Sequence, residues 1–189
     1  MSTLNLPLRT RRLVLRRFEA GDLEAFHAYH CLPETARFLP REAKTYTQSM
    51  EYVGKYANFE FEREGDWVAL AIEAADAPGL LGEVVLKWLP GRGQAEVGWS
   101  LAPAARGKGY AAEAAEAMLK LGFEEVGFHR IDAKLDALNT ASAALCERLG
   151  MRHESTQVDK WHYKGQWATE VVFALLAEEW AAREEITTI

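Results

Sequence analysis

Arg106-Gly107-Lys108-Gly109-Tyr110-Ala111 is the most informative stretch of the chain, because its glycines lie between a strand expected to end near Leu101 and a helix expected to begin near Tyr110. A turn at this point exposes the unpaired amides of the helix N-terminus, and the helix dipole strengthens their attraction for an anion. Glycine also lets a ligand approach the backbone closely. Arg106 and Lys108 add positive charge at the rim, so the stretch predicts a cradle for a pyrophosphate.

The glycines do not fit two common phosphate-binding motifs. Lys108 is followed by Gly109, where the P-loop requires Ser or Thr to bind magnesium. The third glycine of the dinucleotide-binding GxGxxG pattern is also missing. Taken alone, the string is open to a second interpretation, as a solvated loop that caps a helix. The sequence on either side favours the cradle.

The sequence after the glycines predicts a helix, a strand and a second, short helix. Over residues 110–126, small and apolar residues recur at helical spacing, and charged residues fall elsewhere. Over residues 130–136, apolar and charged residues alternate with the two-residue period of a half-exposed strand. Asn139 is expected to cap the short helix, and Gly150 is expected to end it.

The rest of the chain contributes mostly strands. Residues 67–75 and 80–89 are strand-like, and the turn-favouring Asp76-Ala77-Pro78-Gly79 joins them into a hairpin. Further strands are expected at 13–18, 94–101, 155–163 and 167–176. Helices are expected at 23–29, capped by Asp22, and at 45–63. This order of elements predicts an α+β fold, with a mixed, mostly antiparallel central sheet flanked by helices.

Composition narrows the class of protein. A hydrophobic content of 49% in 189 residues supports one core, and the composition shows no break, so we expect a single domain over residues 1–189. A net charge of −6 argues against nucleic-acid binding and favours a cationic partner such as an amine. Cys31 and Cys146 lack the spacing of a zinc site, so no metal is expected and both thiols are expected to be reduced. With no membrane-spanning run and no signal-like start, we expect a cytoplasmic protein that binds no membrane.

The glycine stretch also matches a family signature. The acetyl-CoA-binding pattern of the GNAT N-acetyltransferases, (Gln/Arg)-x-x-Gly-x-(Gly/Ala), is present as Arg106, Gly109 and Ala111. Residues 95–103 resemble the strand that precedes this signature in the family, and residues 139–142 and 149–151 resemble the coenzyme-contacting helix that follows it. The two ends of the chain resemble those of the RimJ/RimL group, which acetylates ribosomal-protein N-termini. The resemblance implies a GNAT fold, acetyl-CoA as co-substrate and a primary amine as acceptor.

The resemblance also implies roles for individual residues. Glu96 occupies the strand position where many relatives place a carboxylate, as a general base that acts on the ammonium substrate through water; a solvent-facing strand carboxylate is the alternative. A backbone amide of Trp99 or Ser100 is implied as the donor that holds the oxyanion. The coenzyme-binding residues implied by the family are Trp99, Ser100, Leu101, Arg106, Gly107, Lys108, Gly109, Tyr110, Ala111 and Asn139.

One position departs from the family pattern. Much of the superfamily places a Tyr, as general acid for the leaving thiolate, seven residues after the helix-capping Asn, and Cys146 stands there instead. Ser142 lies one turn earlier on the same face and resembles the serine that has this role in the RimL group. A buried serine that bonds to its own helix is the alternative. Ser142 is therefore the second catalytic candidate, after Glu96.

The acceptor itself is left open. A protein N-terminus or a small amine is the first expectation, for an enzyme acting as a monomer or homodimer. An aminoglycoside-type or metabolite amine acetyltransferase is an alternative, and a non-catalytic acyl-CoA-binding module is an alternative of another class. Trp67, Trp88, Trp161, His162 and Trp167 are either an aromatic lining for an amine pocket or core residues, and isolated aromatics in strands favour the core.

Overall fold

The fold is described from a computed structural model, which places residues 4–187. The strands are β1 (Leu8–Arg9), β2 (Leu13–Arg16), β3 (Trp67–Ala74), β4 (Ala77–Leu89), β5 (Gln94–Leu101), β6 (Arg130–Asp136), β7 (Arg152–Tyr163) and β8 (Gln166–Leu176). The α-helices are α1 (Leu23–His30), α2 (Pro33–Ala36), α3 (Tyr46–Ala57), α4 (Tyr110–Lys120), α5 (Thr140–Arg148) and α6 (Ala177–Thr187). Short 3₁₀ turns cover Ala20–Asp22 and Pro103–Ala105, and a π-helical segment, Leu121–Val126, continues α4.

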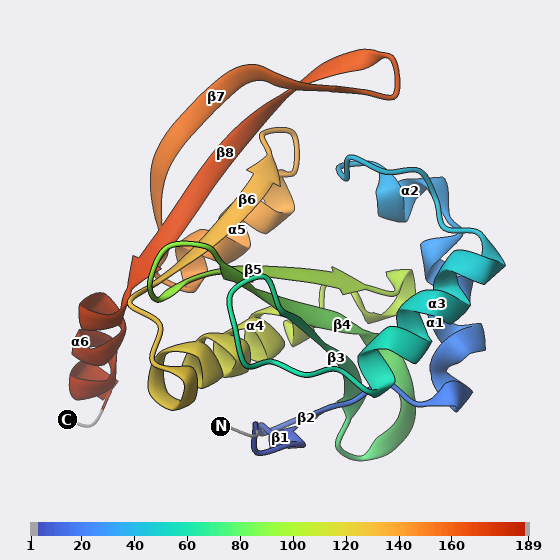
Figure 1. Cartoon of the computed structure of the whole chain (residues 1–189), viewed down its shortest axis with the longest axis horizontal. Coiled ribbons are helices and arrows are strands. Elements are labelled where there is room, and N and C mark those ends of the chain that lie inside the picture. The colour runs from blue at the N-terminus through green and yellow to red at the C-terminus, as the bar shows by residue number, and fades with distance from the viewer. Residues whose placement is uncertain (1–3, 188–189) are drawn as a thin grey trace.

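All eight strands form one sheet in the order β1-β2-β3-β4-β5-β6-β8-β7. Only β5 and β6 run parallel, and every other neighbouring pair is antiparallel. The predicted α+β fold with a mixed, mostly antiparallel sheet is therefore confirmed. The β7–β8 hairpin reaches far beyond the rest of the sheet and curves toward the side of the molecule where α2 lies (Figure 1).

The two faces of the sheet are covered by different helices (Figure 1). Glu83 of β4 contacts Tyr29 and His30, so this face packs against α1 and, beside it, α3. Leu86 points the other way, toward the segment that follows α4, because residues three apart in a strand lie on opposite faces. Gly122 allows that close packing, since a Cβ there would lie 2.7 Å from Ile131 Cδ1.

One predicted helix ends earlier than expected. The stretch 45–63 forms a helix only to Ala57, and Asn58 leaves helical geometry, with φ −130° and ψ 41°. Glu62 and Arg63 belong to a separate turn, in which their amides donate to Asp66 Oδ2 at 2.9 and 3.0 Å. The stretch 110–126 is helical over its whole length, as predicted, with an α-helix to Lys120 and a π-helical segment over Leu121–Val126. The Thr45 cap of α3 is reinforced by Gln48, whose side chain accepts the Thr45 amide at 2.9 Å.

Two further local predictions need correction. Asp22 does not cap α1 with its side chain, since both of its oxygens bind Arg16, at 2.8 and 2.9 Å. The turn between β3 and β4 lies at residues 75–76, because Pro78 and Gly79 already belong to β4, where the register with β3 is irregular.

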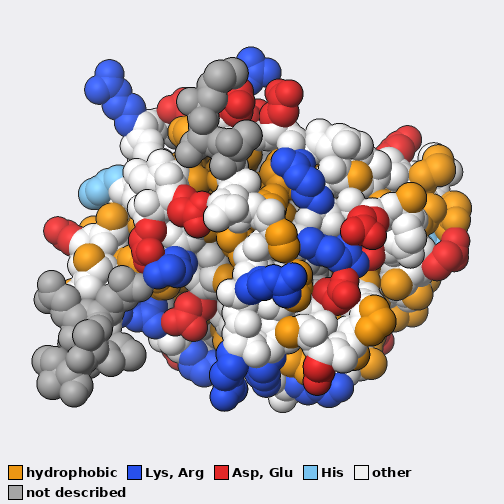
Figure 2. Space-filling model, turned by 90° about the horizontal axis from the view of Figure 1, so that it is seen from below, with side chains coloured by type: hydrophobic (Ala, Val, Ile, Leu, Met, Phe, Trp, Pro, Cys, Tyr) orange, Lys and Arg blue, Asp and Glu red, His pale blue; other side chains and the backbone are white. Residues whose placement is uncertain are grey.

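Over the face seen in Figure 2, acidic and basic side chains are interspersed. Within residues 4–187, no helix combines the length and hydropathy needed to cross a membrane.

Candidate active site

The parallel pair β5–β6 separates partway along its length. The two strands pair only over three positions, from Gln94↔Arg130 to Glu96↔Asp132. Beyond Glu96, β5 continues beside β4 to Leu101, while β6 continues beside β8 to Asp136. We call this point the fork. β5 and β6 are parallel, so their carboxyl ends point to the same edge of the sheet. The helices that follow them, α4 and α5, therefore begin at that edge, which is where ligands bind in α/β-type sites.

The glycine turn, residues 106–111, leads from β5 into α4 with the backbone geometry that the sequence predicted. Gly107 and Gly109 have φ angles of 74° and 78°, in the left-handed region that favours glycine. The first hydrogen bond of α4 is donated by Glu113 N to Gly109 O, at 3.2 Å. The amides of Tyr110 and Ala111 precede it and therefore have no partner within the helix. These amides can receive an anion.

Two N-terminal residues that the sequence analysis did not single out hold the glycine turn in place. Thr10 Oγ1 and the Arg12 amide donate to Glu113 Oε1 at 2.6 and 2.8 Å, and Arg12 Nε donates to Glu113 Oε2 at 2.6 Å. Arg12 Nη1 also donates to the carbonyl oxygen of Lys108 at 3.0 Å. Burial opposes ionisation of Glu113, but the bonds from Thr10 and Arg12 outweigh it and lower the pKa of the carboxyl.

Arg106 points away from the turn that it begins. Its Nε donates to Leu101 O at 3.1 Å, and its Nη1 lies 3.5 Å from Glu34 Oε1 near α2. The guanidinium therefore joins the end of β5 to α2 rather than adding charge at the glycine rim. Its backbone amide is also engaged, with Pro103 O at 3.2 Å.

Helix α5 lies across the fork from β5. Asn139 caps it as predicted, with Oδ1 accepting the Ser142 amide at 3.2 Å. Trp99 of β5 donates its indole N–H to Ser142 Oγ at 3.3 Å, so these two predicted residues are brought together. Cys146 is fully buried one turn further along, and burial raises the pKa of its thiol to about 12.

Glu96 lies at the point of the fork and is held by a cation. Lys134 Nζ lies 2.8 Å from Glu96 Oε2, and both side chains are partly exposed. Burial lowers the pKa of Lys134, but the hydrogen bond and charge of Glu96 outweigh it and raise that pKa. In the register of β4 and β5, Glu96, Gly98 and Ser100 share the sheet face that carries Glu83. Glu96 thus lies on the α1 side of the sheet.

On the same face lies a buried polar cluster that the sequence analysis missed. Glu83, directly across from Ser100, accepts the Tyr29 hydroxyl at 3.2 Å and lies 3.0 Å from His30 Nε2. Arg41 Nη2 lies 3.0 Å from His30 Nδ1 on the other side of the ring. A lone carboxylate within the apolar run Leu80-Leu81-Gly82-Glu83-Val84-Val85 was the available signal, because buried charges need partners.

The aromatic residues considered for an amine pocket do not gather into one lining. Trp88 packs against Phe61 and Phe128 in the core, at ring distances of 5.6 and 5.1 Å. Trp161 and Trp167 lie on the long hairpin, and Trp167 is 62% exposed. At the hairpin tip, Lys164 Nζ donates to the Ala36 carbonyl and joins the hairpin to α2. In the part of the chain that the structure describes, no group of three or more His, Cys, Asp or Glu is placed to hold a metal ion.

Comparisons with known proteins agree with this geometry. The model of the acetyltransferase (GNAT) domain matches residues 12–152. The uncharacterized N-acetyltransferase YnaD of Bacillus subtilis is 32% identical over 172 residues, which cover 90% of this chain and 97% of YnaD. The crystal structure of a GNAT-family acetyltransferase from Bacillus anthracis superposes with a TM-score of 0.82 at 30% identity, covering 91% of this chain and 99% of that one.

A more distant structure shows the same fold with coenzyme bound. Spermidine N-acetyltransferase from Vibrio cholerae, in complex with CoA and spermine, has a TM-score of 0.77 at 22% identity, over 91% of this chain and 99% of that one. GNAT acetyltransferases use acetyl-CoA. The match to the domain over most of the chain, with the fork and glycine turn in place, shows that the protein belongs to the GNAT acetyltransferase family and is an acyltransferase.

Proposed function

We propose that the protein transfers the acetyl group of acetyl-CoA directly to a primary amine at the fork. The observation that carries this proposal is the separation of β5 from β6 beside two helix N-termini, one of which begins at the glycine turn. The pyrophosphate binds the amides of residues 107–111, with Asn139 and Ser142 beside the coenzyme arm. The thioester then lies against β5 at Trp99, Ser100 and Leu101.

The reaction forms a C–N bond and breaks the C–S bond. Glu96 takes the proton of the ammonium substrate through water, so that a neutral amine attacks the carbonyl. Lys134 holds the Glu96 side chain in position at the fork, with its Nζ 2.8 Å from Glu96 Oε2. A backbone amide of Trp99 or Ser100 donates to the oxyanion, and Ser142 donates a hydrogen bond to the departing thiolate.

The acceptor is a protein N-terminus or a small amine. The likeness of the chain ends to the RimJ/RimL group supports a peptide N-terminus. The bridge between Lys164 and Ala36 supports a small acceptor, because it joins the hairpin tip to α2. The two free thiols, Cys31 and Cys146, support action in the reducing cytoplasm.

Release of free thiol from acetyl-CoA tests the proposal. The purified protein is assayed with N-terminal peptides, polyamines, amino acids and aminoglycosides, and calorimetry measures acetyl-CoA binding in parallel. We expect binding together with amine-dependent thiol release. Binding without turnover by any amine would favour a non-catalytic acyl-CoA-binding module, and absence of binding would overturn the site itself.

A further inference from the structure

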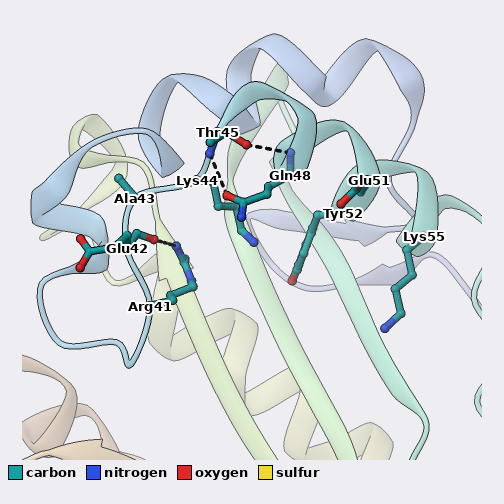
Figure 3. Close-up of a pocket in the computed structure, with 9 residues that line it drawn as sticks. All are labelled: Arg41, Glu42, Ala43, Lys44, Thr45, Gln48, Glu51, Tyr52 and Lys55. Atoms are coloured by element: carbon teal, nitrogen blue, oxygen red, sulfur yellow. Dashed lines mark hydrogen bonds between the residues drawn. The ribbon is translucent and has the colours of Figure 1, made fainter. Parts of the chain in front are cut away.

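A cavity of about 450 Å³ lies between the start of α3 and the segment that precedes it. Figure 3 shows the side chains of Arg41, Lys44, Tyr52 and Lys55 extending to the same side of this segment. The remaining lining residues are Glu42, Ala43, Thr45, Gln48 and Glu51. None of these lining residues belongs to the fork or to the glycine turn.

Three cations line this cavity: Arg41, Lys44 and Lys55. Among the side chains of residues 4–183, no carboxylate oxygen lies within 4.0 Å of the charged nitrogens of Arg41, Lys44 or Lys55. Arg41 Nη1 donates to the backbone oxygen of Glu42, and the Glu42 carboxylate points away from it (Figure 3). Lys44 Nζ lies over the Tyr52 ring at 4.9 Å. Arg41 and Lys44 are also partly buried, and a partly buried charge without a counter-ion favours an anion.

The cationic lining is held in place by the buried cluster behind it. Because a guanidinium only donates, His30 Nδ1 accepts from Arg41, which leaves the ring proton on Nε2 to donate to Glu83. The Lys44 amide donates to the His30 carbonyl at 2.8 Å. Arg41 and the Lys44 backbone are therefore fixed before any ligand arrives, which lowers the entropy lost on binding.

The charges around Lys44 also favour an anion in the cavity. Burial lowers the pKa of Lys44, the positive charge of Arg41 lowers it further, and Glu83 opposes both effects without reversing them. The carboxylate of Glu83 is already occupied by Tyr29 and His30. An anion between Arg41 and Lys44 would relieve their mutual repulsion.

The cavity is linked to the proposed site of acetyl transfer. Two hydrogen-bonded contacts, Arg41 to His30 and His30 to Glu83, connect its wall to the β4 residue directly across from Ser100. We propose that this cavity is a subsite for an anionic group, a carboxylate or a phosphate, so that the acceptor is a small amine that also carries a negative charge. This inference rests on the proposed function. It disfavours polyamines, because a second ammonium would meet Arg41 and Lys44.

Matched acceptor pairs test the subsite. Alanine is compared with alaninamide, and phosphoethanolamine with ethanolamine, in the parent, in Lys44→Gln and in the control Arg63→Gln. Lys44 is the residue to change, because removing Arg41 would also break the His30 contact. Arg63 gives the same loss of charge on a side chain that is 87% exposed and outside the cavity.

We expect the parent to prefer the anionic member of at least one pair, and the pair that shows the preference identifies the anion. Lys44→Gln should raise KM for that acceptor on the order of ten-fold, with kcat and the neutral partner little changed, and Arg63→Gln should change neither. Equal KM values for both members of each pair in the parent, or a preference for spermidine or for neutral peptide N-termini, would overturn the inference.

A binding measurement separates failure of the subsite from failure of the proposed function. Inorganic phosphate is titrated into the protein without coenzyme and followed by ¹⁵N–¹H NMR. Saturable shifts at the Arg41 and Lys44 amides in the parent, lost in Lys44→Gln, would support the subsite even if no acceptor were turned over. Shifts confined to residues 107–111 would place the anion site at the glycine turn and overturn the subsite.

Discussion

Trp99 of β5 and Ser142 of α5 are joined by a hydrogen bond of 3.3 Å that connects the two sides of the fork. The indole N–H can only donate, so the serine oxygen accepts and its own hydrogen stays available for another group. The contact also fixes the position of α5 relative to β5. A thioester held against β5 would then lie near a hydroxyl whose hydrogen remains free to donate.

Gly109→Val should weaken acetyl-CoA binding, on the order of ten-fold or more in Kd by calorimetry. Gly109 has a φ of 78°, which a β-branched side chain adopts at a cost of about 1–3 kcal/mol, and its Cβ would lie 3.3 Å from Arg12 Nη2. Gly127→Val is the matched control, since Gly127 has a φ of 81° and open space around it. If the two variants bind coenzyme equally well, the glycine turn is not the pyrophosphate site.

Glu96→Gln should depress turnover most at neutral pH, on the order of 10²-fold, with partial recovery at high pH where the amine is deprotonated in solution. Lys134→Met is the companion variant, because it removes the cation but keeps the carboxylate. It should retain far more activity than Glu96→Gln. A pH–rate profile for Glu96→Gln that superimposes on that of the parent would assign Glu96 to structure alone.

Glu113→Gln should destabilise the fold at pH 7 by about 1–3 kcal/mol, because the carboxylate accepts from Thr10 and Arg12. Since the folded-state pKa of Glu113 is lowered, its contribution is full above the unfolded-state pKa and is lost as pH falls through the folded-state value. The free energies of unfolding of parent and variant, measured in urea, should therefore become equal as pH falls below about 4. Glu116→Gln, on an exposed part of the same helix, should show little difference at either pH. A difference in free energy of unfolding between parent and Glu113→Gln that stays constant with pH would contradict this role of the Glu113 carboxylate.

Local signals in the sequence were sufficient for most of the fold. Gln94–Leu101 forms the strand expected of it, and Asn139 and Gly150 delimit α5, because alternation and capping act over a few residues. Features that depend on residues outside the predicted stretch were missed. The turn after α3 depends on Asp66, and the two-residue strand β1 becomes visible only through its pairing with β2.

In the candidate site, too, local features could be predicted from the sequence and long-range contacts could not. The glycine turn and the α5 cap could be predicted, since each is contiguous in sequence. The clamp of Arg12 on Glu113 spans 101 positions, and the contact of His30 with Glu83 spans 53, so no local pattern carries them. A motif identifies a residue but not the direction of its side chain. Arg106 matches the signature, yet its guanidinium contacts Leu101 and α2 and not the glycine turn.

Ser142, and not Cys146, is predicted to assist departure of the coenzyme thiolate. Ser142 is partly exposed and keeps a free hydroxyl hydrogen beside Trp99. Cys146 is fully buried, and the rise of its pKa to about 12 makes the thiol a weak source of protons as well as an inaccessible one. Ser142→Ala should lower kcat on the order of 10²-fold with little change in acetyl-CoA affinity.

Cys146→Ala and Trp99→Phe complete the comparison. Cys146→Ala removes a small buried side chain, so it should cost about 1 kcal/mol of stability and little rate. Trp99→Phe deletes the indole donor but leaves the hydroxyl, so its loss of rate should be smaller than that of Ser142→Ala if the serine itself acts on the thiolate. Equal losses for Trp99→Phe and Ser142→Ala would mean that the bond between them serves only to position α5. A larger loss in Cys146→Ala than in Ser142→Ala, at saturating acceptor, would instead assign the role of the missing Tyr to Cys146.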